Sequence, residues 1–231
     1  MADVLILAIE TATGCGGVSL TKGGVDEGRV LAEYTLQPEI THSRRLLGSI
    51  GAMMEAAGVG WGDLDAVAVS LGPGSFTGLR IGMAAAKGIA MGASLPLLGV
   101  PTLDGLAAQA TPTELPLCCL LDARKQQVYA AFYSFKAGRC LRTSDFIVVS
   151  AEQLAQRIQE PTLVVGPGIN ACQSTLAGQP LARLAPAGLL HPRAAFIGFV
   201  GAAMLAQGQG NDDLVPLYVR ASEAELNLRH Q

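Results

Sequence analysis

The sequence predicts an α/β protein built from two related halves. Apolar runs rich in β-forming residues alternate with segments of helical periodicity, which is the pattern of a mixed α/β chain. A similar mixed set of elements begins again near Pro101. Half of the 231 residues are hydrophobic and only 15% are charged, and a chain of this length can bury about 70% of its unfolded surface. We therefore expect one large domain or two small ones.

The first half is expected to begin with a β-hairpin and a third strand. These strands are Val4–Ile9, Gly17–Thr21 and Val30–Leu36. A helix from Ser43 to Ala57 follows, because its apolar residues fall on one stripe at helical spacing. Asp65–Ser70 is the next predicted strand, and it leads into a glycine-rich turn.

The segment from Phe76 to Ala93 has helical periodicity but is apolar nearly all round, with Arg80 and Lys87 as its only charges. A helix without a polar face has to be covered on both sides. The pairs Gly78/Gly82 and Gly88/Gly92 would let another helix approach closely. The 28 glycines of the chain show no Gly-X-Y period, which excludes collagen and indicates tight turns and close helix contacts.

In the second half, strands alternate with two recognisable helix starts. The predicted strands are Pro116–Leu121, Val128–Phe135, Phe146–Val149, Thr162–Val165 and Val215–Arg220. Ser150 and Gln153 have the spacing of a capping box, so a helix is expected to run from there to Ile158. His191-Pro192 should open a last helix that ends near Gln207, with proline in its first turn.

Charge and cysteine content limit the partners and the compartment. The net charge of −3 argues against a protein that grips a nucleic-acid backbone alone, which normally carries a basic footprint. The longest apolar stretch, Ala194–Ala206, is shorter than the ~20 residues of a membrane span, and the start lacks a basic signal-peptide region. Five cysteines without a Cys-x-x-Cys spacing fit reduced thiols in a cytoplasmic protein.

Two turns are candidates for phosphate chemistry. The stretch Gly72–Gly78 supplies glycines, Ser75 and Thr77 before a helix N-terminus, which is either an anion cradle or a tight turn capped by Ser75. It is not a Walker A loop, because Gly-Lys-Ser/Thr is absent. The stretch Glu10–Thr13 lies in the first hairpin turn, where actin-like ATPases hold phosphate and metal, although such a turn needs no ligand.

Other catalytic patterns are missing or weak. His42, His191 and His230 are the only histidines and none has a His-x-x-x-His partner, so a hydrolytic metal centre is not expected. No Gly-x-Ser-x-Gly elbow occurs. The residues Asp122, Arg124 and Tyr129 around the second-half hairpin form either a polar site or an exposed turn with an ion pair.

Several strings together resemble the TsaB family, also called YeaZ. They are Ile6–Thr13, His42-Ser43, Gly72–Gly82, Ala86–Gly88, Asp122–Arg124 with Val128-Tyr129, and Pro216–Arg220. The match runs in order over essentially the whole chain, and Gly-Pro-Gly-Ser-Phe-Thr-Gly-Leu-Arg-Ile-Gly is its most specific part. Glu10 replaces an aspartate common in the family, and Gln127 stands where an acidic residue often precedes Val-Tyr.

The resemblance implies two actin-like or Hsp70-like (ASKHA, ribonuclease H-like) domains with mixed sheets flanked by helices. We assign these to residues 1–100 and 101–231, with the C-terminal segment able to pack back on the first. Members of the family are partner proteins in the synthesis of N6-threonylcarbamoyladenosine at position 37 of tRNA, and they are similar to the catalytic TsaD but lack its paired histidines. The chain is thus expected to be a non-catalytic scaffold without a cofactor, which binds TsaD, supports TsaE recruitment and meets tRNA only through the complex.

The family dimer is formed by the first two helices of the N-terminal domain, here Ser43–Ala57 and Phe76–Ala93. The second of these is the helix that lacks a polar face, so periodicity points to the same surface. We expect TsaD, or a second copy of the chain, to bind through Leu46, Ile50, Met54, Leu79, Met83 and Lys87.

Two enzymatic functions are alternatives to a scaffold, and the sequence disfavours the second. An actin-superfamily nucleotide-dependent phosphotransferase would need carboxylates to hold magnesium and to act as base, and Glu10 and Asp122 are the ones near suitable turns. A metallopeptidase would need metal ligands that the sequence does not offer.

Overall fold

The computed structural model describes residues 3–36, 42–211 and 213–220, which divide into two compact units. The first unit contains the described residues up to Gln109 together with Pro192–Pro216, and the second contains Ala110–His191 and the described residues from Leu217 onward. This division differs from the one expected from the sequence, 1–100 and 101–231. The chain returns to the first unit because its last helix packs on the first sheet.

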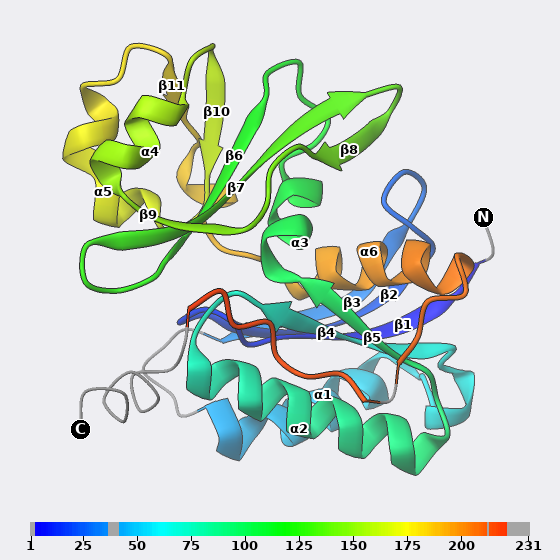
Figure 1. The fold of residues 1–231 in the computed structure, drawn as a ribbon. Helices are drawn as coiled ribbons and strands as arrows, with labels where there is room; N and C mark the ends of the chain where they lie inside the picture. The colour runs from blue at the N-terminus through cyan, green and yellow to red at the C-terminus, as the bar shows by residue number, and fades with distance from the viewer. Residues whose placement is uncertain (1–2, 37–41, 212, 221–231) are drawn as a thin grey trace, which may run out of the picture. The chain divides into compact units, whose positions relative to one another are not determined.

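The first unit is a five-stranded sheet covered by helices on both faces (Figure 1). The strand order is β3-β2-β1-β4-β5, with β1 parallel to β4 and β4 parallel to β5, and with β2 antiparallel to both of its neighbours. The strands are β1 (Leu5–Glu10), β2 (Gly16–Lys22), β3 (Arg29–Leu36), β4 (Ala66–Gly72) and β5 (Leu97–Pro101). The helical segments are α1 (His42–Ala57), η1 (Trp61–Asp63), α2 (Phe76–Ala93), α3 (Thr102–Gln109) and α6 (Ala194–Ala206).

Covering both faces explains the sequence pattern of this sheet. All six residues of β1 are buried, as expected for a strand with helices on both sides. One apolar cluster joins the sheet to α1 and α2, and a second joins it to α6. Glycine lets α6 approach the sheet closely, because a Cβ at Gly201 would lie 2.9 Å from the Cβ of Ala68. The long apolar stretch of the sequence is therefore a core helix.

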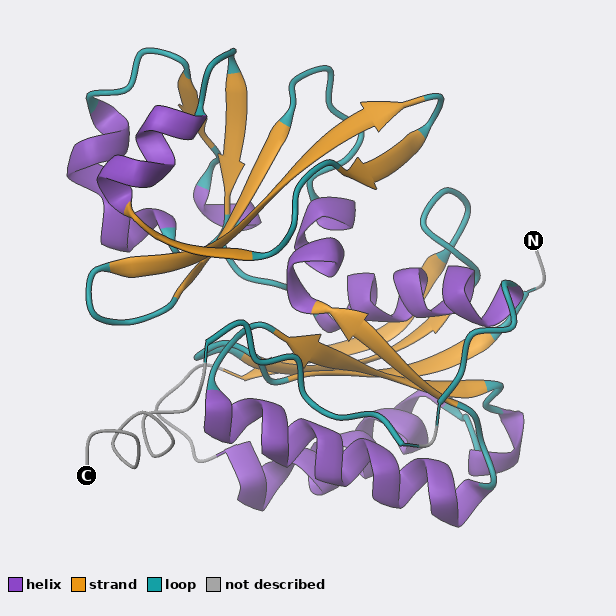
Figure 2. Cartoon of the chain, viewed as in Figure 1, coloured by secondary structure: helices purple, strands orange, loops and turns teal. Residues whose placement is uncertain are grey.

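The second unit holds a six-stranded sheet, with α4 and α5 packed on one face (Figure 2). The path is β11-β10-β6-β7-β8, and β9 pairs with β7. The strands are β6 (Leu117–Asp122), β7 (Gln127–Lys136), β8 (Arg139–Arg142), β9 (Ile147–Ser150), β10 (Thr162–Val165) and β11 (Ala182–Leu184). The helices are α4 (Ala151–Arg157), α5 (Ile169–Ala177) and the short η2 (Ala187–Leu189). The predicted capping box of α4 is confirmed.

The predicted fold class, α/β with two mixed sheets flanked by helices, is confirmed, and α2 has the predicted bounds. The prediction of a strand at Val215–Arg220 is wrong, since no strand is found between residues 213 and 220. Val215 is 72% exposed there, and neighbouring Leu214 packs on Gly99. The last helix begins at Ala194, so Pro192 precedes it.

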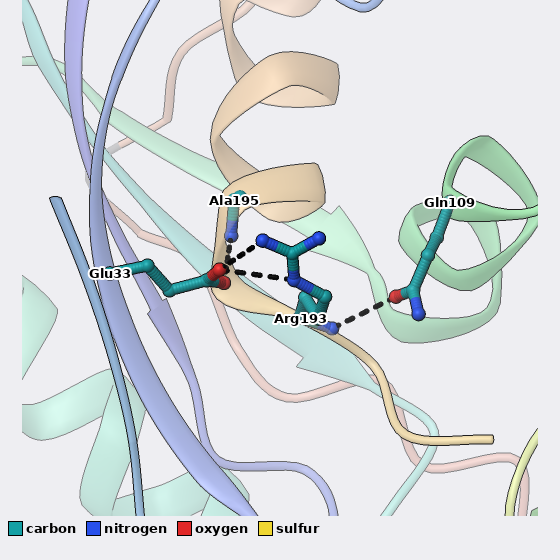
Figure 3. A network of polar contacts seen from close by, with 4 residues as sticks. All are labelled: Glu33, Gln109, Arg193 and Ala195. Carbon is teal, nitrogen blue, oxygen red and sulfur yellow. Dashed lines mark hydrogen bonds and ion pairs between the residues drawn. The ribbon is translucent and has the colours of Figure 1, made fainter. Parts of the chain in front are cut away.

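A polar network fixes the start of α6 (Figure 3). The Oε1 of Glu33 accepts a hydrogen bond from the amide of Ala195 at 3.0 Å. The guanidinium of Arg193 pairs with Oε2 of Glu33, and its Nε lies 3.0 Å from that oxygen. The amide of Arg193 donates to Oε1 of Gln109 at 3.1 Å. A carboxylate at a helix N-terminus is stabilised by the unpaired amides and the helix dipole, so Glu33 anchors α6 to the edge strand β3.

The sequence predicts neither membrane-spanning helices nor disulfides. Among the described residues, none of the helices combines the length and hydropathy that crossing a membrane requires. All five cysteines lie within the described residues, and none forms a disulfide.

Candidate functional site

The first candidate site is the junction between the β1–β2 turn and the start of α2. The hydroxyl of Thr11 donates a hydrogen bond to the carbonyl oxygen of Gly78 at 2.8 Å. The amide of Ser75 donates to the carbonyl oxygen of Ala12 at 2.6 Å, and the amide of Thr11 donates to Oγ of Ser70 at 3.2 Å. The turn is therefore bonded directly to the first residues of α2 and to the end of β4.

Glycine at this junction allows the chain to contact itself. A Cβ at Gly74 would lie 2.3 Å from the carbonyl oxygen of Ala12. A Cβ at Gly78 would lie 2.0 Å from the carbonyl oxygen of Thr11, and one at Gly82 would lie 2.1 Å from its Oγ1. These separations are far below van der Waals contact. The glycines of this stretch thus let the β1–β2 turn pack directly against the start of α2.

The interpretation of Ser75 as an N-cap is confirmed. Its Oγ accepts a hydrogen bond from the amide of Gly78 at 3.3 Å. A cavity beside Thr11 has a volume of only about 10 Å³, which is near the minimum for one water molecule. This geometry fits a tight strand-to-helix turn capped by Ser75.

Glu10, at the end of β1, is fully buried. Its Oε1 accepts a hydrogen bond from the amide of Ala12 at 2.6 Å, whereas Oε2 has no hydrogen-bond partner. Burial raises the pKa of Glu10 from its usual 4.5 to about 8, against the opposing effect of the Ala12 amide. The carboxyl group is thus mainly neutral at pH 7.

The predicted partner-interface residues need correction, because five of the six side chains face the core. Leu46, Ile50, Met54, Leu79 and Met83 are each at most 6% exposed, while Lys87 is half-buried. An apolar stripe on a helix that packs on a sheet is the face turned to the sheet. A partner cannot reach these five side chains while the unit is folded. The use of the helix pair as a partner surface stays a prediction, but it must involve other residues.

Both helices also present small and apolar residues to solvent. We call the outward helix face the exposed residues Leu47, Gly48, Gly51 and Ala52 of α1 with Ala84, Gly88 and Met91 of α2. Leu47 is 61% exposed and Met91 is 80% exposed. A Cβ at Gly48, Gly51 or Gly88 would meet no atom within 4 Å. The face therefore combines protruding side chains with positions where another backbone could come close.

A groove of about 800 Å³ lies at the C-terminal ends of α2 and α6. Lys87 is the one charged residue among those that line it, and Met91 of the outward helix face also contributes. The groove is formed well away from Ser75 and the start of α2. It offers no carboxylate for magnesium.

The second candidate site contains the predicted polar residues Asp122, Arg124 and Tyr129, which lie at the turn between β6 and β7. The Oδ1 of Asp122 accepts a hydrogen bond from the amide of Arg124 at 2.7 Å. Burial raises the pKa of Tyr129, while Arg220 acts in the opposite direction. Arg220 also pairs with Oε1 of Gln127, a contact that the separation of 93 residues hid from sequence reasoning. The expected ion pair of an exposed turn is thus replaced by a backbone bond and a distant arginine.

The described residues contain no group of three or more His, Cys, Asp or Glu side chains that could hold a metal ion. The side chains of His42 and His230 lie outside the described residues.

Comparison with protein families finds one match over more than half of the chain. Residues 29–159 match the family model described as TsaD, tRNA N6-adenosine threonylcarbamoyltransferase. The chain is also 28% identical to the tRNA threonylcarbamoyladenosine biosynthesis protein TsaB of Bacillus subtilis, over 95% of this chain and 96% of the relative. The TsaB protein of Escherichia coli is 39% identical over 55% of this chain and 54% of its own length.

Solved structures give the same result at the level of the fold. YeaZ from Pseudomonas aeruginosa superposes with a TM-score of 0.76 and 27% sequence identity, covering 93% of this chain and 99% of that protein. A second structure from the same organism, described as similar to peptidase YEAZ, has a TM-score of 0.77 and covers 94% of this chain and 100% of that one.

Proposed function

This chain belongs to the TsaB (YeaZ) family, and on that premise we propose that it takes part in the biosynthesis of threonylcarbamoyladenosine in tRNA as a non-catalytic subunit. Its partner is the catalytic subunit TsaD, and it supports the recruitment of TsaE. It meets tRNA through this assembly, in the cytoplasm, and it needs no cofactor of its own.

The outward helix face is the observation that carries this proposal. Leu47 and Met91 are large apolar side chains at 61% and 80% exposure, and the other residues of the outward helix face are glycine and alanine. Burying such a surface against a second helix pair stabilises a complex by about 25 cal/mol per Å² of apolar area. Open space above Gly48, Gly51 and Gly88 allows the partner helices to pack closely. We assign TsaD to this face, and a second copy of the chain competes for it.

The junction of the β1–β2 turn with α2 supports a scaffold over a phosphotransferase. A nucleotide-dependent enzyme of the actin superfamily holds phosphate at this turn, and here the hydroxyl of Thr11 in the turn is bonded to the carbonyl oxygen of Gly78. Glu10, the carboxylate nearest to the turn, is buried and has a raised pKa. A turn that is bonded to α2 and a buried Glu10 both support a scaffold over a phosphotransferase.

A charge on the outward helix face tests the proposal. We expect Ala84→Glu to abolish co-elution with TsaD and to reduce formation of modified tRNA in a reconstitution from threonine, bicarbonate, ATP and tRNA. Ala84 is exposed, so the variant should fold. A charge at Met83, by contrast, would enter the core and would report on folding instead of binding.

Ala171→Glu is the matched control, because it places the same charge on an exposed alanine of α5 in the second unit. Circular dichroism and thermal melting verify that both variants are folded. Wild-type binding of TsaD by a folded Ala84→Glu variant would remove the outward helix face from the proposal. Full product formation without this chain would refute the scaffold role. Calorimetric binding of magnesium-ATP with turnover would favour the phosphotransferase instead.

A further inference from the structure

The second unit is basic, although the whole chain carries a net charge of −3. Its described residues include eight Lys and Arg against five Asp and Glu, whereas those of the first unit include seven against ten. Three of the eight basic residues lie on the β7–β8 hairpin, and the stretch Tyr133–Arg142 contains no acidic residue. They are Lys136, Arg139 and Arg142, and all three are exposed.

The hairpin places two of these charges side by side. Lys136, the last residue of β7, is paired with Arg139, the first residue of β8. The two residues between them, Ala137 and Gly138, have φ values of 49° and 77°, as a tight type I′ turn requires. Directly paired residues of two antiparallel strands have Cβ atoms about 5 Å apart and project from the same face of the sheet. The tip of the hairpin therefore holds a lysine and an arginine next to each other.

Like charges in this position destabilise a hairpin unless an anion lies between them. Among the described residues, neither Lys136 nor Arg139 forms an ion pair. A phosphate group satisfies both, because a guanidinium binds two of its oxygens and an ammonium binds it as a point charge. The tip is consequently suited to a single phosphate.

A stacked pair of side chains joins the end of β8 to the segment before β9. The guanidinium of Arg142 lies over the ring of Phe146, at 4.0 Å from its centre. Leu141 is 48% exposed next to it. Stacked arginine and aromatic side chains are surfaces on which unpaired nucleobases stack. An acidic protein surface would gain little from such a stack, so these neighbours favour RNA over protein as the source of the phosphate.

We propose that the β7–β8 hairpin (Figure 1) binds the sugar-phosphate backbone of tRNA, with Lys136 and Arg139 on one phosphate. Side chains alternate along β8, so the stack of Arg142 on Phe146 lies on the other face of the hairpin, where an unpaired base of the same RNA can stack. The identity of the RNA rests on the proposed function. The net charge of the chain keeps this contact weak in isolation, so it adds to binding within the assembly. TsaB is then a subunit that touches the substrate as well as a scaffold.

The test compares two double variants with equal changes of charge. Lys136→Glu/Arg139→Glu reverses the pair at the hairpin tip. Arg157→Glu/Arg183→Glu reverses two exposed residues elsewhere in the second unit. The glutamates keep the hairpin charged, so the edge strand β8 does not gain a tendency to self-associate. Binding of unmodified tRNA is measured on the complex with TsaD and on the isolated full chain at low salt, at several salt concentrations.

We expect the tip variant to weaken tRNA binding by roughly tenfold and to lower the slope of log K against log salt by about 1, as the loss of one phosphate contact requires. The control pair should retain most of the affinity. Unchanged tRNA binding by the tip variant, or an equal loss in both variants, would overturn the inference. A tip variant that loses TsaD while binding tRNA normally would show a protein contact and would overturn it as well. Failure of the wild-type chain to bind TsaD would count against the proposed function alone, since the measurement on the isolated chain still tests the hairpin.

Discussion

Replacing Glu10 by glutamine should change how the stability of the protein depends on pH. The carboxyl group is fully buried, and Oε2 has no hydrogen-bond partner. Its pKa is about 8 in the folded protein, against a usual value of 4.5. Because the folded state binds the proton more tightly than the unfolded state, protonated Glu10 favours folding. That contribution is complete below pH 4.5 and is lost as the pH rises to about 8.

The size of the effect follows from the same two values. One pKa unit corresponds to about 1.4 kcal/mol, so the wild-type free energy of unfolding should fall by several kcal/mol between pH 4.5 and 8, with roughly 5 kcal/mol as the upper limit. Glutamine has no proton to lose in this range, and its oxygen can still accept the hydrogen bond from the amide of Ala12. The variant should therefore gain stability relative to the wild type at each step from pH 5 to pH 8, and no further above pH 8.

Urea unfolding at constant ionic strength from pH 5 to pH 9 measures this difference. Glu27→Gln is the control, since it makes the same change at an exposed position of the first unit. The reasoning fails if the difference between wild type and Glu10→Gln stays constant within about 1 kcal/mol over this range. It also fails if Glu27→Gln produces the same gain.

Four further substitutions test the packing and the helix caps of the fold. Gly78→Ala should destabilise the chain by roughly 3 kcal/mol or more, because the new Cβ would lie 2.0 Å from a backbone oxygen of Thr11. At Gly88 a new Cβ meets open space, so Gly88→Ala should stabilise the helix by up to about 1 kcal/mol. Urea unfolding measures both changes, and effects of equal sign would contradict the reasoning. Glu33→Ala should lower stability by about 1–2 kcal/mol and speed amide hydrogen exchange at the start of α6, so unchanged exchange there would exclude the cap. Ser150→Ala should remove about 1 kcal/mol, with faster exchange confined to the first turn of α4.

Local patterns in the sequence predicted most elements, and their failures have physical causes. The bounds of α2 follow from a continuous helical pattern between a capping serine and the end of the apolar run. The short strand β5 was not among the predicted strands. It contains glycine and ends in proline, so its residues do not show the composition that is usual for a strand. Sequence alone could not tell which side of α2 faces the core, because nearly every position is apolar. The apolar residues of α2 that were predicted to bind the partner are the ones that pack the helix on the sheet.

Contacts between distant residues were beyond such patterns. Glu33 and Arg193 are 160 residues apart, and no periodicity relates them. The same holds for the contact between Thr11 and Gly78. The glycine motif could be recognised in the sequence, but the segment that packs against it could not. Only the folded chain shows that the β1–β2 turn packs against these glycines.

The return of the chain to the first unit also constrains the order in which the protein can fold on the ribosome. The face of the first sheet that includes Ile6 and Ala8 is buried by α6, and α6 begins only at Ala194. Domains usually fold during synthesis from the N-terminus onward, yet this one has to wait until most of the chain has been translated. For that period an apolar sheet face stays open on the nascent chain, so a ribosome-associated chaperone has a defined surface to protect until the last helix emerges.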